Sequence, residues 1–540
     1  MIEPDWIPDV ILLPKNKKQI SRILKIAHDN KIPVIPRGNG TSLSVASMAP
    51  YGGIILDLSG MNKINSVDIE NFLVDVEPGV ICDDLNAILK DKGFFFPPDP
   101  GSSSVATIGG MVSHNSAGIQ SFKYGTTKNY VLYLECVLPG GKIVTFGNSV
   151  LKSASSYNFK DLIIGSEGTL AVVTRIGLKI LPLPKEHKVG LFIFEKIEDL
   201  TGAVLDLRRK GVIPNMMEFL DHTLVKLIFE HVGGEFLDYP VGYALLVEVD
   251  GKTDFEVNEE ILMVLEIFNS HSLIFSKIAS TKKDRDRLIG ARKALLPAIS
   301  KLGPTVCAED CTIQVTKFTS AVKLFEELPE KLGISNIKVA MAGHMEGNIH
   351  PVFIFNENDP KDREDFEKAL DYLYKEIVIP LGGSITGEHG IGKIKSPYLG
   401  LEHGSDVVDL MYQVKKIFDP NMIMNPGSGK GDPILVSSSS RTRKLKRFPR
   451  NILELNCMRC GFCLVNCPSK AYFKTEAYSP RGRLSILNAM VHGEIPPEKY
   501  ESINKILYAC TLCGQCLVKC PSGVQTQEIF ERAREILHKD

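Results

Sequence analysis

The 540-residue sequence predicts an α+β protein built of three successive parts. Its length fits three or four domains at roughly 150 residues each. Segments with helical and strand periodicity alternate up to residue 427, and eight of the 12 cysteines lie in two short runs near the C-terminus. A hydrophobic fraction of 44% with 24% charged residues excludes a disordered or fibrous chain.

The charge balance and the absence of long apolar runs narrow the class of protein. With 63 basic and 64 acidic residues, no net charge favours binding to nucleic acid. No apolar stretch reaches the ~18 residues of a transmembrane helix, and the N-terminus lacks the features of a signal peptide. We therefore expect a cytoplasmic protein. Peripheral association with a membrane remains open.

The first predicted domain, residues 1–184, mixes helices and strands with glycine-rich connections. The expected elements are a helix at 20–27, strands at 31–35, 54–58 and 72–76, a helix at 83–93, and a hairpin over 131–146.

The second predicted domain, residues 185–427, has longer strands, such as 243–249, and amphipathic helices, such as 316–332. A linker follows at 428–450, where glycines and serines precede a basic run from Arg441 to Arg450. This run is interpreted as a solvated tether or as a docking site for an acidic partner or a membrane surface. Residues 451–540 form the third domain, a helix-rich one that carries the clustered cysteines.

The clustered cysteines repeat one pattern, C-x2-C-x2-C-x3-C-P, which is typical of proteins with two iron–sulfur clusters. Three cysteines wrap one side of a cubane, and the fourth reaches the other cluster. We therefore predict two [4Fe-4S] centres that relay electrons, and expect helices between the motifs. Zinc would require only pairs of cysteines, which disfavours that alternative. The predicted ligands are Cys457, Cys460, Cys463 and Cys520 for one centre, and Cys510, Cys513, Cys516 and Cys467 for the other. The remaining Cys82, Cys136, Cys307 and Cys311 are expected to be buried thiols.

Four glycine segments in the first domain indicate a site for a two-electron cofactor. The first, residues 36–42, follows a strand, and its glycines let backbone N–H groups approach phosphate oxygens. It matches neither the Rossmann nor the P-loop spacing, and alone it is no stronger evidence than an ordinary turn. The other three glycine segments are residues 96–101, 106–118 and 165–170.

These segments, in this order, closely resemble the FAD-binding domain of the vanillyl-alcohol oxidase/p-cresol methylhydroxylase (PCMH) superfamily. Further segments resemble its D-lactate dehydrogenase, glycolate oxidase and D-2-hydroxyglutarate dehydrogenase branch: residues 247–251, 292–297, 309–310, 383–392 and 418–427. The resemblance implies a PCMH-type FAD-binding domain of two subdomains and a cap domain of the FAD-linked oxidase C-terminal type. Residues 451–540, including Ser479–Leu484, resemble α-helical ferredoxin domains.

By this resemblance the FAD is expected to be noncovalent, with a covalent link left open only at His114. The predicted FAD-binding residues are Pro36, Arg37, Gly38, Asn39, Gly40, Thr41, Ser42, Pro98, Asp99, Thr107, Gly109, Gly110, Ser113, Asn115, Ala117, Gly118, Glu167, Gly168 and Asn425. The chain departs from the branch at Val45 and Ala171, where glycine is usual, and at Gln314-Val315, where proline-arginine is expected.

Oxidation of a 2-hydroxy acid requires a cation for the carboxylate and a base for the hydroxyl proton, while the flavin receives a hydride. Arg292 is the predicted carboxylate-binding cation, because a guanidinium pairs with a carboxylate through two bonds. The alternative is a surface arginine in a charged helix. His389 is the predicted base, because an imidazole titrates near neutral pH. The alternative is a structural histidine in a loop.

His344, His350 and Glu388 could bind a divalent cation, as the resemblance implies, and two imidazoles with a carboxylate suit zinc, manganese or iron(II). The segment before His350 is one residue shorter than in the family, which aligns Gly343 with the first ligand. An extended chain would still project His344, Glu346 and His350 to one side. The alternative is that the histidines cap a strand.

The predicted function is the oxidation of a D-2-hydroxy acid of the lactate, glycolate or 2-hydroxyglutarate class. Only 20 residues follow Cys520, so we expect an external electron acceptor: a quinone-linked protein, an electron-transfer flavoprotein or a ferredoxin. The alternative is an electron-transfer subunit without its own substrate. A redox-neutral synthase fits poorly with the iron–sulfur motifs.

Overall fold

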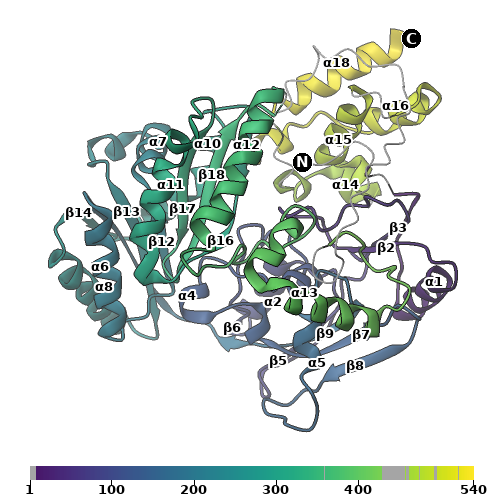
Figure 1. Ribbon diagram of the computed structural model, residues 1–540, viewed down its shortest axis with the longest axis horizontal. Coiled ribbons are helices and arrows are strands. Elements are labelled where there is room, and N and C mark those ends of the chain that lie inside the picture. The colour runs from purple at the N-terminus through teal and green to yellow at the C-terminus, as the bar shows by residue number, and fades with distance from the viewer. Residues whose placement is uncertain are drawn as a thin grey trace.

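The computed structural model describes residues 6, 8–357, 359–428, 457, 461–473, 475–491, 495–520 and 522–539. Three parts follow one another along the chain, as predicted (Figure 1). The predicted linker, apart from Ser428, and Cys460 lie outside the described residues.

The first domain begins with a small parallel sheet in the order β1-β3-β2, formed by β1 (Val10–Leu12), β2 (Val34–Arg37) and β3 (Ile54–Asp57). Helix α1 (Lys17–Asp29) packs against it through Ile20, Leu24 and Ala27, which recur at helical spacing and are fully buried. The Asn16 side chain caps this helix by accepting a hydrogen bond from the Gln19 N–H. Strand β2 leads directly into the first glycine segment.

The second subdomain is a five-stranded antiparallel sheet in the order β4-β5-β9-β7-β8. The predicted hairpin over 131–146 is confirmed as the antiparallel pair β7 and β8. Its elements are β4 (Ile64–Asp68), β5 (Leu73–Val76), β7 (Val131–Val137), β8 (Ile143–Gly147), β9 (Val172–Lys179), α2 (Cys82–Lys90), α3 (Ile108–His114), α4 (Ser121–Tyr124) and α5 (Phe159–Ile163), with the short pair β6 (Phe94–Phe95) and β10 (Leu181–Pro182). The two sheets confirm the predicted two-subdomain architecture.

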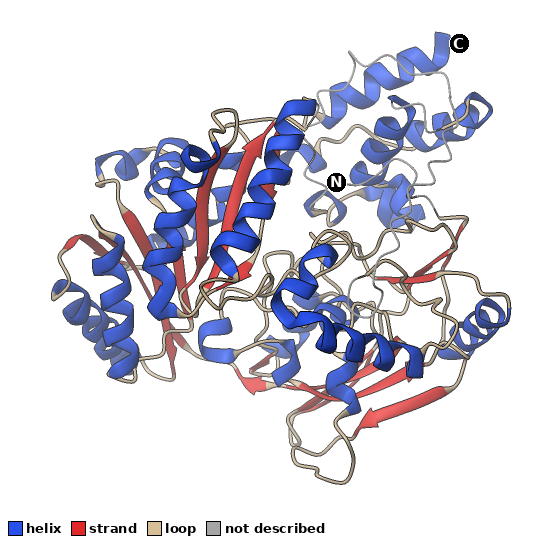
Figure 2. Ribbon diagram, viewed as in Figure 1, coloured by secondary structure: helices blue, strands red, loops and turns tan. Residues whose placement is uncertain are grey.

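The cap domain is built on one antiparallel sheet in the order β14-β11-β13-β12-β17-β18-β15, with β16 also paired to β18 (Figure 2). Helices α6, α8, α11 and α12 cover one face, and α7, α9 and α10 cover the other. The strands are β11 (Glu186–Phe194), β12 (Met216–Leu220), β13 (Tyr243–Gly251), β14 (Leu273–Ile278), β15 (Thr305–Ala308), β16 (Cys311–Thr312), β17 (Lys338–His344) and β18 (Asn348–Phe355). The helices are α6 (Ile197–Arg209), α7 (His222–Val232), α8 (Asp254–Asn269), α9 (Lys282–Lys293), α10 (Leu295–Ile299), α11 (Phe318–Leu332) and α12 (Pro360–Tyr372).

The end of the predicted cap segment returns to the first domain. Helix α13 (Leu399–Phe418) carries the fully buried Lys415, whose ammonium donates to the Thr169 carbonyl at 2.7 Å. Phe418 contacts the rings of Phe146 and Phe159. The Asn425 N–H donates to the Val34 carbonyl at 2.8 Å. This segment therefore packs against the first domain, although it follows the cap domain in the sequence.

The third domain is helical, as predicted, and α14, α15 and α16 lie between the two cysteine motifs. In Figure 1, α14 is near β2 and β3, and α18 projects away from the rest of the molecule. The fully buried Arg483 donates to the Ile506 carbonyl at 2.9 Å and thereby ties α15 to α16. The helices are α14 (Pro468–Phe473), α15 (Pro480–Val491), α16 (Tyr500–Tyr508), α17 (Gln515–Val518) and α18 (Thr526–Lys539).

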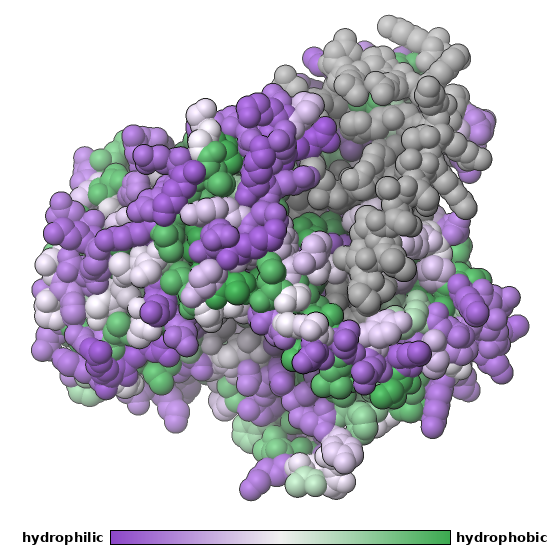
Figure 3. All heavy atoms as spheres, in the orientation of Figure 1, coloured by the Kyte–Doolittle hydropathy of each residue, from purple (hydrophilic) through white to green (hydrophobic). Residues whose placement is uncertain are grey.

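The surface is mainly polar on the face shown in Figure 3, with apolar residues scattered among polar ones. Among the described helices, none combines the length and the apolar character needed to span a bilayer.

Candidate active site

The two predicted metal-binding histidines lie on neighbouring strands. β17 ends at His344, which pairs with Asn348, while His350 on β18 pairs with Ala342. The histidines therefore share one face of the sheet, with ring centroids 5.3 Å apart. The expectation that one extended chain projects them together is wrong, because residues 345–347 form a turn. Glu346 lies in this turn and accepts a hydrogen bond from Ser121 of the first domain.

Glu388 completes what we call the cap triad: His344, His350 and Glu388. Its Oε1 lies 3.4 Å from His344 Nε2 and 3.3 Å from His350 Nε2. One ligand atom from each of the three residues lies within 4.8 Å of the others. The short histidine segment therefore does not prevent the predicted set from converging.

Two carboxylates stand behind the imidazoles of the cap triad. Glu218 on β12 pairs with His344 Nδ1, and an oxygen of Asp310 lies 3.7 Å from His350 Nδ1. Carboxylates in this position fix the tautomer and ring orientation of histidines that bind metals through Nε2. The buried Asp310 Oδ1 and His350 Nδ1 have no hydrogen-bond partner in the described structure. The donor set and its supports therefore fit a divalent cation.

The local electrostatics also favour positive charge at the cap triad. Burial opposes protonation of His344, but Glu218 and Glu388 outweigh it and raise the His344 pKa well above its ordinary value. Burial would raise the Glu388 pKa, but His344 and His350 hold it well below its ordinary value. The Glu218 pKa falls to about 2 despite its burial, because His344 and Arg292 lie beside it. A bound cation would take the place of these protons.

Asp310 holds the backbone of the cap loop, residues 383–392. Its Oδ2 accepts hydrogen bonds from the N–H groups of Gly387 at 2.8 Å, Glu388 at 3.0 Å and His389 at 2.9 Å. It also accepts one from the Thr386 hydroxyl at 2.6 Å. Burial would raise the Asp310 pKa, but His389 and Lys395 lower it below its ordinary value. In the sequence, Asp310 stands out only as part of a segment that resembles the family, because no local pattern indicates that it holds the cap loop.

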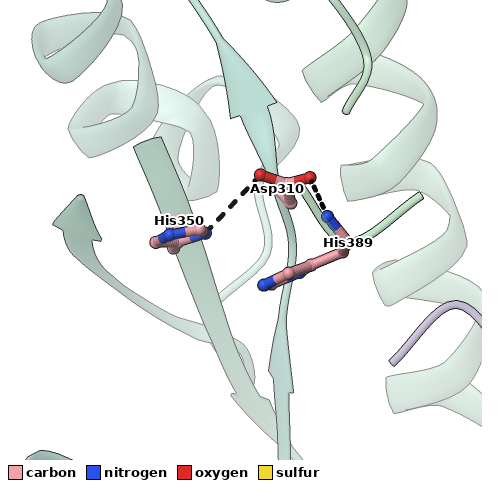
Figure 4. A group of neighbouring side chains, drawn as sticks. All are labelled: Asp310, His350 and His389. Carbon is pink, nitrogen blue, oxygen red and sulfur yellow. Dashed lines mark hydrogen bonds and ion pairs between the residues drawn. The ribbon is translucent and has the colours of Figure 1, made fainter. Parts of the chain in front are cut away.

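His389 lies beside the cap triad and next to Asp310 (Figure 4). Its ring stacks on that of His350, with centroids 5.0 Å apart and an angle of 12° between the planes. Burial lowers the His389 pKa and favours the neutral imidazole. A neutral imidazole can accept a proton, so this position suits the predicted base.

The glycine segments converge in the first domain and pack closely. A Cβ on Gly38 would lie 2.2 Å from Thr107 Oγ1, and one on Gly118 would lie 2.4 Å from the Asp99 backbone. The Asn39 amide donates to the Val105 carbonyl at 2.8 Å. These close approaches explain why glycine stands at positions 38 and 118. The other predicted FAD-binding residues of these loops are Pro36, Gly40, Thr41, Ser42, Pro98, Gly109, Gly110, Ala117 and Gly168.

Several predicted FAD-binding side chains have structural partners in the protein. Ser113 donates to the Gly109 carbonyl at 2.9 Å, and Asn115 accepts from the Thr126 hydroxyl at 2.9 Å. Asn425 donates to the Glu167 carbonyl at 2.7 Å. Arg37 pairs with Glu476 of the third domain at 2.7 Å.

Glu167 links the first domain to the cap loop. Its buried carboxylate accepts the N–H groups of Ile391 and Gly392, both at 2.8 Å, and the Ser428 hydroxyl at 2.9 Å. The loop that carries His389 is thereby fixed against the domain that contains the glycine segments.

Arg292, the predicted carboxylate-binding cation, pairs with a carboxylate of the protein. Its Nε and Nη2 contact Glu218 Oε2 at 2.8 and 2.6 Å. Because Glu218 also pairs with His344, Arg292 supports the cap triad from behind. These contacts engage one edge of the guanidinium, through Nε and Nη2, and the assignment of Arg292 to a substrate carboxylate stays a prediction.

The departures from the family pattern have different consequences. Val45 has φ +50°, in the left-handed region where glycine is favoured, so the backbone keeps the conformation that the usual glycine permits. Val315 packs in the cap-domain core and supplies no charge to the site. Ala171 is buried in the core of the first domain.

The second cysteine motif forms a cavity with one cysteine of the first. Cys467, Cys510, Cys513 and Cys516 line this cavity together with Ser469 and Phe530. This arrangement fits the predicted crossing of ligands between motifs and could hold a cubane cluster. Cys457 and Cys520 both pack against the hydrophobic core of the third domain. Outside the motifs, Cys82, Cys136 and Cys311 are buried as expected, whereas Cys307 is partly exposed.

Three family models match the chain and together define an FAD-binding oxidoreductase that carries iron–sulfur motifs. An FAD binding domain matches residues 8–147, and the C-terminal domain of FAD linked oxidases matches residues 183–428. A 4Fe-4S dicluster domain matches residues 455–524.

Curated relatives show the family. The glycolate oxidase subunit GlcD of Bacillus subtilis is 36% identical over 78% of this chain and 88% of its own length. The D-lactate dehydrogenase of Archaeoglobus fulgidus is 35% identical over 77% of this chain and 90% of its own. The chain therefore belongs to the FAD-linked oxidase family that contains these proteins, as predicted.

Solved structures share the fold at low sequence identity. The 4-ethylphenol oxidase of Gulosibacter chungangensis has a TM-score of 0.64 at 14% identity, with coverage of 80% of this chain and 91% of its own. The p-cresol methylhydroxylase has a TM-score of 0.63 at 16% identity, with coverage of 78% and 88%. These likenesses confirm the predicted PCMH-type architecture.

Proposed function

We propose that this chain oxidises a small D-2-hydroxy acid to the 2-oxo acid and passes the electrons through two [4Fe-4S] clusters to an external acceptor. The observation that carries the proposal is the position of Glu388 and His389 on the loop that Glu167 fixes to the first domain, beside His344 and His350. Relatives are named glycolate oxidase subunit and D-lactate dehydrogenase, and glycolate and D-lactate are both 2-hydroxy acids.

The protein residues would divide the catalytic tasks among them. When bound, FAD supplies a two-electron acceptor, a divalent cation supplies a Lewis acid, and the clusters supply one-electron relays. His389, neutral in its buried position, accepts the substrate hydroxyl proton. Asp310 fixes the position of His389 through its backbone N–H. Glu218, braced by Arg292, orients His344.

The proposed cofactor ligands are the groups of residues described above. The cap triad would bind zinc, manganese or iron(II). The glycine segments would bind FAD noncovalently. The eight motif cysteines would hold two clusters in the crossed pattern, with a quinone-linked protein, an electron-transfer flavoprotein or a ferredoxin as acceptor.

A second candidate is an electron-transfer subunit whose cap binds no substrate. Val315 favours it, because the cation expected from the family is missing there and the residue lies in the core. The convergence of the cap triad argues against it, since a conduit would not require ligand-type side chains held by carboxylates.

The test is anaerobic mixing of the holoprotein with D-lactate, glycolate and D-2-hydroxyglutarate, with L-lactate for comparison. The flavin absorbance should bleach with at least one of the three substrates, whereas a pure conduit would stay oxidised. In the His389→Asn variant, bleaching should slow by roughly 10²- to 10⁴-fold, the usual contribution of a general base.

A matched control is His271→Asn, which alters a cap-domain histidine that pairs with Asp206. This variant should bleach at the normal rate, and all variants should retain FAD. Unimpaired bleaching in His389→Asn would show that His389 is not the base.

A further inference from the structure

A three-residue ion-pair bridge joins the cysteine domain to the first glycine segment. Arg37 Nη2 donates to Glu476 Oε2 at 2.7 Å, and Arg481 Nε donates to Glu476 Oε1 at 2.6 Å. Arg481 Nη2 also donates to the Asn39 carbonyl at 2.7 Å. Arg37 and Glu476 are 439 positions apart, so the bridge exists only when the two domains are docked.

The bridge is well enclosed and balanced in charge. The Arg481 side chain is 5% exposed and that of Arg37 18%, while Glu476 is 29% exposed. Asp57 lies 3.8 Å from Arg37 Nη1 and offsets the second arginine. Burial would raise the Glu476 pKa, but Arg37 and Arg481 lower it below its ordinary value. Removal of the Glu476 charge would take away the carboxylate that the two enclosed guanidinium groups share.

The bridge lies beside the first cysteine motif. A Cβ on Gly461 would lie 3.0 Å from Arg481 Nη1. Gly461 directly precedes the short helix Phe462–Leu464, which contains Cys463. One guanidinium therefore touches both the first cysteine motif and the loop predicted to bind FAD phosphates.

The second motif has a different setting. Cys513 is exposed, and the cavity it lines with Cys467 is also lined by Gln527 and Phe530 of α18. In Figure 1, α18 lies on the side of the third domain away from β2 and β3. The first motif therefore lies next to the loop predicted to bind FAD phosphates, whereas the second lies next to α18.

We propose that the Arg37–Glu476–Arg481 bridge docks the cysteine domain on the flavin site and makes the centre of Cys457 and Cys463 the entry point for electrons. The centre at Cys513 is then the exit to the external acceptor. Each transfer oxidises the reduced flavin by one electron and reduces the entry cluster from the 2+ to the 1+ state, with flavin protons released to solvent. The entry cluster passes each electron to the exit cluster and returns to the 2+ state, so two successive transfers return the flavin to its oxidised form.

This proposal rests on the proposed function for its cofactors but not for its substrate. The test therefore uses the holoprotein reduced by light and a deazaflavin, so that a wrong substrate assignment would not affect it. Cluster reduction is followed by its absorbance and electron paramagnetic resonance signals after a flash that reduces the flavin. The Glu476→Gln variant should slow cluster reduction by roughly tenfold, the factor that ~1.4 kcal/mol of docking free energy represents.

The matched control is Glu501→Gln in the same domain. Glu501 pairs only with Lys505 among the described contacts, and both side chains are exposed, at 86% and 74%. This variant should behave as the unmodified protein, because exposed pairs contribute little. Glu476→Asp, which keeps the charge, should recover part of the rate.

A second readout measures docking directly. Small-angle scattering of the holoprotein should show a larger radius of gyration for Glu476→Gln than for Glu501→Gln, at equal FAD and iron content. If Glu476→Gln loses iron, the comparison moves to Glu476→Asp and to the unmodified protein in rising salt, where cluster reduction should slow. Unchanged rates and unchanged scattering in these measurements would overturn the proposal.

Discussion

The cap triad and the cysteine domain both gather ligand-type side chains, but they do so by opposite routes. The cysteines lie in two short runs whose spacing already describes the geometry of a cluster. The cap triad comes from two strands and a loop, and its orientation depends on Glu218 and Asp310 from other elements. Local spacing thus identifies the ligands in one region, whereas tertiary support defines the site in the other.

The largest expected effect concerns the cysteine domain, where the ligands are predicted from the local spacing of the cysteines. Cys513→Ala removes a proposed ligand, so the iron content should fall from about eight to about four atoms per chain, with FAD unchanged. Iron analysis and electron paramagnetic resonance measure this loss. Cys307→Ala, outside the motifs, is the control and should keep all the iron. Full iron content in Cys513→Ala would refute the assignment of Cys513 as a cluster ligand.

The next effect tests the support of the cap loop. Asp310→Asn removes the charge that holds three successive N–H groups, and flavin reduction by substrate should slow by about 100-fold. Anaerobic stopped-flow absorbance measures the rate. Asp371→Asn alters an acid that bonds Lys375 and Tyr398 away from the site, and it should have little effect. A rate for Asp310→Asn within twofold of normal would show that the cap loop keeps its conformation without the Asp310 charge.

The smallest effect tests the orientation of one ligand. Glu218→Gln removes the carboxylate charge at His344 Nδ1, so zinc affinity should fall by roughly tenfold. Competition with a chromophoric chelator measures this affinity. Glu235→Gln, which alters a surface pair with Arg287, is the control. Equal zinc affinity in both variants would show that Glu218 does not support zinc binding.

Much of the fold could be predicted from the sequence, and so could the three side chains that converge as the cap triad. The hairpin over 131–146 carries its turn residues within the segment, and the glycine segments converge as expected. Glu218 and His344 are separated by 126 positions, so no local pattern connects them. Arg292 and Glu218 are separated by 74 positions, so the sequence does not indicate their contact either. The expectation of an extended chain between His344 and His350 also did not include the turn at residues 345–347.

The contact between Glu167 and the cap loop has a mechanical consequence. If the cap rotated away as a rigid body, the buried Glu167 carboxylate would lose the N–H groups of Ile391 and Gly392. Such an opening is costly, so the two domains should behave as one block during turnover. Small molecules are then expected to enter and leave by rearrangement of side chains rather than by a hinge, and crystals should tolerate soaking with substrate without cracking.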